Sequence, residues 1–245
     1  MKVYLDNCIL VDIEKGNLSL SDFCHIRGAE YYFSSAHMDE LYRGLNSNAN
    51  LKDRRLSTLS VLCGENYIIQ DLQGQSMELE PMSSEKAFKL CKAFRTLADL
   101  TEKVVADNLP NRDGIIEELK LNKIEVGNIV PSKIFNILES KLMESPNRFG
   151  VEEFLRRSEA YTLKAKYSTL FNLLDSVFYW KDEHNINRLY DSSHACHAQY
   201  CDMLVTNDRR MAIKAKAIYS YFGVKTQVKN SDEYLLYLRF NNELV

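Results

Sequence analysis

The sequence predicts an α/β protein in which a mainly parallel sheet forms the central layer of a three-layer fold. Short apolar strands alternate with helical segments up to about residue 70, and the same alternation returns after about residue 187. Between these two parts, almost every segment has the apolar spacing of a helix. Because strand–helix alternation is typical of a parallel sheet with helices on both faces, the helical middle is expected to be an insertion.

The first part of the chain contains three short apolar segments that are expected to form parallel strands. Each is apolar enough for a buried strand and too short for a buried helix. Segments with helical spacing separate them, and Gly16 marks the end of the first helix. In chain order the expected elements are strand 2–5, helix 8–14, strand 31–34, helix 37–45, helix 51–62 and strand 67–69.

The middle of the chain is expected to be helical from Ser83 to about residue 185. Apolar residues between Phe88 and Leu100 recur at helical spacing, and a pair of serines precedes them. The pattern is interrupted at several points, so the middle is expected to contain several helices rather than one. Turns between these helices are indicated at Pro110, Pro131 and Pro146.

Strands and helices alternate again in the last part of the chain. The expected elements there are helix 191–201, strand 203–206, helix 209–222, strand 225–228 and helix 231–238. We therefore expect residues 1–72 and 187–245 to be two halves of one fold, with residues 73–186 as a helical insertion packed on it. Strand 2–5 is expected to lie centrally beside strand 203–206, because both end in acidic residues that would serve one site.

The composition is that of an ordinary globular domain. Hydrophobic residues make up 45% of the 245 residues and charged residues 27%, and no run of 18 apolar residues could span a bilayer. The N-terminus lacks the apolar region of a signal peptide, so the six cysteines are expected to be reduced thiols of a cytoplasmic protein. The formal charge of −3 neither favours nor excludes a nucleic-acid partner.

Four acidic residues stand where a divalent metal site can form. Asp6 and Asp208 each follow a predicted strand, Glu40 lies in a predicted helix, and Asp191 opens another. Acids at the ends of parallel strands point into the crevice where α/β sheets bind ligands. Hard oxygen ligands of this kind suit Mg²⁺ or Mn²⁺. Taken singly, Asp6 or Asp191 could equally cap a helix, so the combination is what indicates a metal site.

Clustered carboxylates favour one kind of chemistry. Like charges placed together destabilise a fold unless a cation compensates them. Metal ions held by such a cluster bind phosphate oxygens, lower the pKa of a water molecule and stabilise the leaving oxygen. Hydrolysis of a phosphodiester bond needs these effects and requires no nucleophile from the protein. The four acids therefore predict a metal-dependent phosphodiesterase.

The order of the motifs resembles that of the PIN-domain nucleases. In that family a strand ends in Asp, a strand with Ser leads into a helix carrying Glu, and a late helix led by Asp precedes a strand ending in Thr-x-Asp. The resemblance covers about residues 1–70 and 187–245, and the last two segments match one subgroup closely. The matching segments are Val3-Tyr-Leu-Asp6-Asn-Cys, Phe33-Ser-Ser-Ala-His-Met-Asp-Glu40-Leu, Asp191-Ser-Ser-His194-Ala and Cys201-Asp-Met-Leu-Val-Thr206-Asn-Asp208-Arg.

The resemblance implies a PIN-like fold and a divalent-metal-dependent nuclease, with single-stranded RNA favoured over DNA as substrate. Mg²⁺ or Mn²⁺ would be the cofactor, and the catalytic and metal-binding residues would be Asp6, Glu40, Asp191 and Asp208. The long segment between Glu40 and Asp191 departs from the small bacterial members of the family. The residues leave open whether the chain is a toxin with an antitoxin partner, an RNA-processing enzyme or a defence component, and whether it forms a homodimer.

Supporting residues are also implied by the resemblance. Thr206 and Asn207 would support the last acid through hydrogen bonds, and Ser35 would play a similar part near Glu40. The asparagine usually found two residues after the first Asp is replaced by Cys8, with Asn7 one place early.

A local basic run directly follows the last acid of the motif. It would hold the nucleic-acid backbone, although a solvated helix face would carry similar residues. The run consists of Arg209, Arg210, Lys214 and Lys216, to which Lys52, Arg54 and Arg55 are candidate additions.

Two other interpretations compete with the nuclease. A helical segment carries His194, Cys196, His197 and Cys201, which could form a zinc site or simply a buried helix face. A non-catalytic interaction module would use the helical insertion as its working surface and the acids as caps. The sequence has no glycine-rich phosphate loop, so it does not support an NTPase or an enzyme that binds a nucleotide cofactor. It also lacks the Gly-x-Ser-x-Gly motif that carries the nucleophile of α/β-hydrolases.

Overall fold

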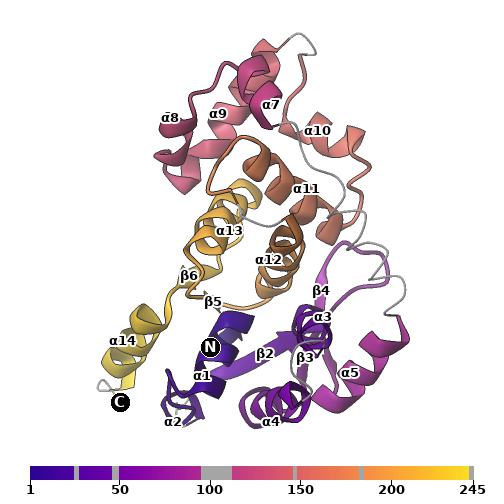
Figure 1. Cartoon of the computed structure of the whole chain (residues 1–245), viewed down its shortest axis with the longest axis vertical. Coiled ribbons are helices and arrows are strands. Elements are labelled where there is room, and N and C mark those ends of the chain that lie inside the picture. The colour runs from indigo at the N-terminus through magenta and orange to yellow at the C-terminus, as the bar shows by residue number, and fades with distance from the viewer. Residues whose placement is uncertain (25–27, 46–49, 95–111, 146–147, 182–184, 243–245) are drawn as a thin grey trace.

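The computed structural model confirms an α/β fold with a mostly parallel sheet (Figure 1). It describes residues 1–24, 28–45, 50–94, 112–145, 148–181 and 185–242. Within these residues, six strands form one sheet in the order β4-β3-β2-β1-β5-β6. The strands are β1 (Lys2–Leu5), β2 (Glu30–Ser34), β3 (Asn66–Gln70), β4 (Met77–Pro81), β5 (Met203–Val205) and β6 (Gln227–Lys229).

β1 lies between β2 and β5, so the predicted pairing of strand 2–5 with the strand at 203 is confirmed. Val3 lies opposite Tyr31 of β2 and Met203 of β5, and both pairs of strands are parallel. β2 with β3 and β5 with β6 are parallel as well. The carboxyl ends of these five strands therefore meet at one edge of the sheet, where ligands bind in open α/β folds.

β4 was not predicted, and its position corrects the expected boundary of the helical insertion. Residues 73–186 were expected to form an insertion that is helical from Ser83 on, but β4 lies in the first part of this range and pairs antiparallel with β3. The turn between the two strands is held by Asp71, whose carboxylate accepts hydrogen bonds from the backbone N–H groups of Gln75 and Ser76 at 2.7 and 3.1 Å. A hairpin of this kind needs only a short connection, so the sheet continues past residue 72.

Helices cover both faces of the sheet. On one face Tyr4 and Leu204 pack with α7 to α13. On the other face Val3 and Leu5 pack with α1, α3, α4 and α14. Alternate residues of each strand thus serve different cores. The helices are α1 (Asn7–Lys15), α2 (Ser21–Cys24), α3 (Ser35–Gly44), α4 (Leu51–Cys63), α5 (Ser84–Ala93), α7 (Arg112–Glu118), α8 (Lys123–Gly127), α9 (Pro131–Glu144), α10 (Val151–Arg157), α11 (Leu163–Ser176), α12 (Asn185–Ala198), α13 (Arg209–Phe222) and α14 (Ser231–Asn242).

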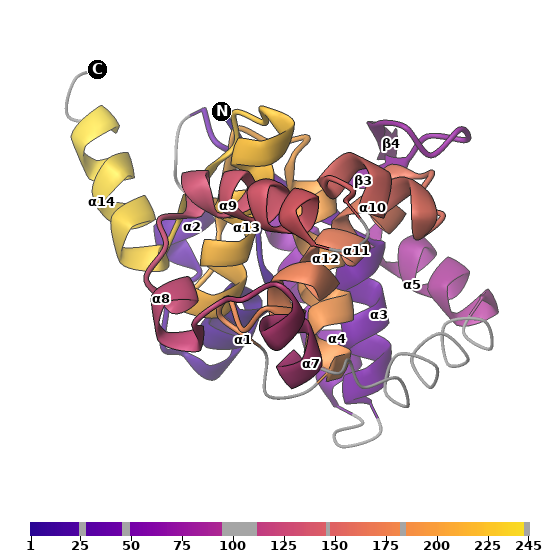
Figure 2. The ribbon, with the colours of Figure 1, turned by 90° about the horizontal axis from the view of Figure 1, so that it is seen from above.

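α7, α8, α9 and α10 gather at one end of the molecule, beyond α12 and α13, whereas α5 lies beside α3 and α4 (Figure 1). α5 and α14 lie at opposite ends of the sheet in both ribbon views (Figures 1 and 2). Pro131 begins α9, as the predicted turn requires, whereas Pro110 and Pro146 lie outside the described residues. None of the described helices has the length and apolar character needed to cross a membrane.

α12 begins at Asn185 rather than at Asp191. Asp191 therefore lies inside the helix, where its side chain cannot act as the N-cap. One of the two interpretations considered for this acid, that of a helix cap, is wrong.

Candidate metal-binding site

Asp6 follows β1 and forms the N-cap of α1. It is only 5% exposed, and a buried carboxylate is costly unless its oxygens accept hydrogen bonds. The backbone N–H of Asn7 donates to Oδ1 at 2.8 Å, and the hydroxyl of Thr206 donates to Oδ2 at 2.7 Å. Because Thr206 follows β5, this last bond ties together the carboxyl ends of two neighbouring strands.

Thr206 also connects Asp6 with Asp208. Its hydroxyl oxygen accepts the backbone N–H of Asp208 at 3.1 Å, in line with the supporting role expected for Thr206. Asp208 is exposed and caps α13, because its Oδ1 accepts the N–H groups of Arg210 and Met211 at 2.8 and 2.9 Å. Both bonds fall on Oδ1, and within the described residues no hydrogen bond to Oδ2 is found.

Cys8 takes part in holding Asp6. Its thiol donates to Oδ2 of Asp6 at 3.0 Å, and its sulfur accepts the backbone N–H of Asn207 at 3.3 Å. Burial, together with the negative charge of Asp6, raises the pKa of this thiol, so it stays protonated and remains a donor. The residue that departs from the family pattern thus still supports the first acid.

Glu40 and Asp6 share a histidine that the sequence analysis did not assign to the acidic site. Nε2 of His194 lies 3.3 Å from Oε2 of Glu40 and 3.8 Å from Oδ1 of Asp6. Burial alone would lower the pKa of His194, but the hydrogen bond and charge of Glu40, together with the charges of Asp6 and Asp39, raise the pKa above the usual value. His194 therefore compensates part of the negative charge of the two carboxylates.

A buried polar network, formed by Tyr4, Ser34, His37 and His194, lies beside the acids. The hydroxyl of Tyr4 is 2.7 Å from Oγ of Ser34 and 2.9 Å from Nδ1 of His194. His37 must donate from Nε2 to the carbonyl of Leu5, at 2.8 Å, because that oxygen can only accept. Burial also lowers the pKa of His37, so its other nitrogen accepts the N–H of Ser34 at 3.2 Å. The network fixes the ring of His194 and thereby Glu40.

Asp191 lies one helical turn before His194, and the spacing of three residues places both on the same face of α12. It is partly buried. This spacing was the signal in the sequence that could have assigned His194 to the acidic site.

No group of three or more His, Cys, Asp or Glu side chains in the described part of the chain is spaced to hold a metal ion as it stands. A zinc site at His194, Cys196, His197 and Cys201 therefore has no support there. His194 links the carboxylates of Asp6 and Glu40, and Thr206 links the carboxylate of Asp6 to the backbone N–H of Asp208. Carboxylate oxygens suit Mg²⁺ or Mn²⁺, and among the described residues no Lys or Arg neutralises Asp6, Glu40 or Asp208. The donor set therefore fits a hard divalent cation.

The side chains of Asn207, Asn7 and Ser35 have partners outside the four acids. Asn207 bonds to Asp12 and Ser231 rather than to Asp208. Asn7 accepts a hydrogen bond from Arg55. Ser35 lines a separate cavity, whereas its neighbour Ser34 caps α3 and contacts Tyr4. Hydrogen bonds from Asn207 to Asp208 and from Ser35 to Glu40 are not found among the described residues, so these two supporting roles stay predictions.

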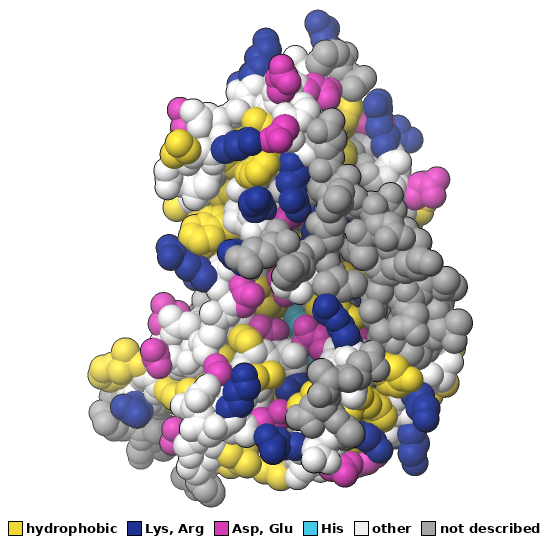
Figure 3. Space-filling view, in the orientation of Figure 1, with side chains coloured by type: hydrophobic (Ala, Val, Ile, Leu, Met, Phe, Trp, Pro, Cys, Tyr) yellow, Lys and Arg dark blue, Asp and Glu magenta, His cyan; other side chains and the backbone are white. Residues whose placement is uncertain are grey.

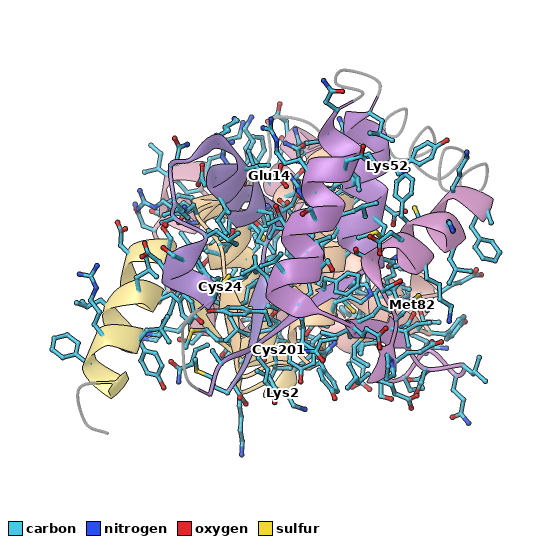
Figure 4. All side chains as sticks on the ribbon, turned by 90° about the horizontal axis from the view of Figure 1, so that it is seen from below. Lys2, Glu14, Cys24, Lys52, Met82 and Cys201 are labelled. Atoms are coloured by element: carbon cyan, nitrogen blue, oxygen red, sulfur yellow. The ribbon has the colours of Figure 1, made fainter. Side chains whose placement is uncertain are left out.

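The predicted basic surface needs two corrections. Lys214 is fully buried, with its ammonium 5.5 Å from the ring of Phe171, so it cannot meet a nucleic-acid backbone. Arg55 of α4 is 2% exposed and forms an ion pair with Glu14 of α1. Figure 4 shows Glu14 on the side of α1 that faces α4. Arg209, Arg210 and Lys216 are exposed on α13.

His197 gives a prediction for the pH dependence of stability. Burial, with a contribution from the charge of Lys164, lowers its pKa to about 3, so folded protein holds it neutral. The unfolded chain takes up this proton near pH 6.5, so stability is lost as the pH falls from about 6.5 towards 3, by up to about 1.4 kcal/mol per pH unit. We expect the unfolding free energy of His197→Gln to fall less steeply over this range in urea titrations. Equal slopes for variant and wild type would contradict the assignment.

No protein-family model, no curated protein and no solved structure matches this chain. A functional assignment therefore rests on the motifs and the geometry of the chain itself.

Proposed function

We propose that the protein is a divalent-metal-dependent nuclease that hydrolyses single-stranded RNA, and that it belongs with the PIN-domain nucleases it resembles. The observation that supports this most directly is the position of Asp6 and Asp208 after two adjacent parallel strands, tied by Thr206. Glu40 is held against the same histidine as Asp6. Three acids from distant parts of the sequence are thereby connected at the ligand-binding edge of the sheet.

Each residue of the site has a definite task in this proposal. Asp6, Glu40, Asp191 and Asp208 would hold Mg²⁺ or Mn²⁺, which supplies the positive charge that activates water and neutralises the phosphate. Thr206 and Cys8 keep the Asp6 carboxylate in place by donating to Oδ2. His194 orients Glu40 through Nε2, while Tyr4 fixes its other ring nitrogen.

The surface around the acids is suited to a polyanion. Figure 3 shows acidic side chains and a histidine near the middle of one face, with Lys and Arg side chains above and below them. Arg209 and Arg210 are exposed directly after Asp208, and the guanidinium of Arg209 lies 4.7 Å from the ring of Trp180. We assign contacts with the RNA backbone to these residues and to Lys216.

Cleavage of a panel of labelled RNAs and single-stranded DNAs tests the proposal. We expect cleavage of single-stranded RNA in Mg²⁺ or Mn²⁺, none in EDTA, and recovery when the metal is restored. Ca²⁺ provides a control for charge alone, because it accepts a larger and more flexible coordination shell than Mg²⁺. Absence of cleavage across the panel in every metal would contradict the nuclease proposal.

A non-catalytic interaction module is the competing proposal, and one observation favours it. Asp6 and Asp208 both cap helices, as acids with a purely structural role would. Asp191, inside α12, does not fit that role. A thermal melt with increasing Mn²⁺ separates the two, because an ion that binds the folded state raises the melting temperature. If the melting temperature of the folded protein does not change with Mn²⁺, the result supports the interaction module.

A further inference from the structure

A cavity of about 500 Å³ lies beside the candidate metal-binding site. It opens at the carboxyl end of β3, where Ile69 and Gln70 line it, and its walls come from α3, α5 and α12. Its volume falls within the usual range for small-molecule sites. The four acids of the candidate metal-binding site do not line this cavity, and neither do the residues of the buried polar network.

The cavity and the acidic site share two helices. α3 contributes Asp39 to the cavity and the next residue, Glu40, to the acidic site. In the same way, α12 contributes Ser193 to the cavity and His194 to the acidic site. β3 is two strands away from β1, so their carboxyl ends are roughly 10 Å apart. A ligand that spans this distance would occupy both places.

Two polar side chains that line the cavity, Ser193 and His197, keep hydrogen-bonding capacity that the described residues do not use. Ser193 is 4% exposed, and the described residues offer its hydroxyl no hydrogen-bond partner. A buried hydroxyl without a partner is costly, and a ligand that accepts a hydrogen bond from it would remove this cost. Nδ1 of His197 donates to the carbonyl of Ser193 at 2.7 Å, so Nε2 of this neutral ring is left as an acceptor.

The remaining wall of the cavity is apolar and partly aromatic. Tyr67 lines it from β3, and Phe94 lies at the end of α5 with 68% of its surface exposed. Met82 lines it from the segment between β4 and α5 (Figure 4). Apolar faces combined with a donor and an acceptor at one edge suit a flat heteroaromatic ligand, and nucleic-acid bases stack on aromatic side chains in this way.

We propose that this cavity binds a base of the nucleic-acid substrate, close to the phosphodiester bond that is cut. The role in cleavage rests on the proposed nuclease function, but binding of the base requires no metal. Because Nε2 of His197 can only accept, bases that present an N–H or an amino group beside an acceptor fit best. Lys164, which also lines the cavity, would face the adjoining phosphate.

Binding of free nucleosides in EDTA tests the site without involving the metal. We expect at least one of adenosine, guanosine, cytidine and uridine to bind with a dissociation constant on the order of 0.1–1 mM. In protein with ¹³C-labelled methionine methyl groups, the nucleoside should shift the signal of Met82. Met203 in β5 and Met211 in α13 do not line the cavity, and their signals should stay in place. No shift of Met82, or an equal shift with ribose alone, would overturn the proposal.

A matched pair of variants tests the contact with the base. Ser193→Ala should weaken nucleoside binding about tenfold, the usual effect of losing one buried hydrogen bond. Ser192→Ala, the neighbouring serine whose hydroxyl bonds to the carbonyl of Leu189, should leave it unchanged. Equal effects of the two substitutions would overturn the proposal, provided that thermal melts show both variants folded.

The outcomes also separate this proposal from the nuclease. Nucleoside binding by a protein that cleaves no RNA would overturn the proposed function and leave the base site standing. Cleavage of RNA by a protein that binds no nucleoside would overturn the base site alone.

Discussion

Replacing Asp208 by asparagine is expected to lower the rate of metal-dependent RNA cleavage by on the order of 10² or more. The substitution removes one negative ligand but keeps the side-chain oxygen that caps α13, and asparagine is as good a cap as aspartate. Folding should therefore survive, and the loss would report on metal-assisted chemistry. Single-turnover cleavage of labelled RNA at saturating Mn²⁺ measures the effect.

Asp202→Asn is the matched control for this experiment. Asp202 is also exposed and stands before β5, whereas Asp208 follows it, so the two lie at opposite edges of the sheet. Its carboxylate accepts the backbone N–H of Lys2 at 2.8 Å. We expect the control to cleave at the rate of the wild type. If Asp208→Asn also does so, any activity seen comes from another site or from a contaminant.

Replacing Arg55 by methionine is expected to lower the free energy of unfolding by about 3–5 kcal/mol. The side chains of Arg55 and Glu14 are 2% and 4% exposed, and the guanidinium also reaches Asn7. Removal of the cation leaves the buried carboxylate of Glu14 without an opposite charge. It also removes the hydrogen bond to the side chain of Asn7, the residue that follows Asp6. Urea unfolding, read by circular dichroism, measures the loss.

Two further variants show whether the ion pair causes this loss. Arg54→Met changes the exposed neighbour of Arg55 and should alter the unfolding free energy by no more than about 0.5 kcal/mol. Adding Glu14→Leu to Arg55→Met should restore much of the stability, since a buried ion pair can be replaced by apolar side chains at little cost. A double variant as unstable as the single one would show that the pair is not responsible.

The sheet was largely predictable because its strands follow simple local rules. β1, β2 and β3 are short apolar runs between turn signals, and helix 209–222 was predicted with its observed bounds. β4 was missed because Met77-Glu-Leu-Glu-Pro is mostly exposed and looks polar. Its alternation of apolar and acidic residues, after a turn with Asp71 and Gly74, was the available signal. Edge strands need little burial, which weakens their hydrophobic pattern.

The residues of the site that could be predicted are those placed by the end of a strand. Asp6 and Asp208 follow strands, and that alone brings them to one edge of the sheet. The bridge from His194 to Glu40 depends on how α12 packs against α3, and Lys214 is buried because its face of α13 meets the core. Such tertiary packing overrides the usual exposure of lysine and leaves no mark in the local sequence.

The pairing of β1 with β5 determines when during synthesis the carboxylates can meet. Val3 pairs with Met203, and the hydroxyl that holds Asp6 belongs to Thr206. Residues 203–206 must therefore be synthesised before the first acid finds its partners, and closure of so long a loop makes this contact a late step in folding. A nascent chain that ends before residue 208 therefore cannot assemble the carboxylates that we propose to bind metal.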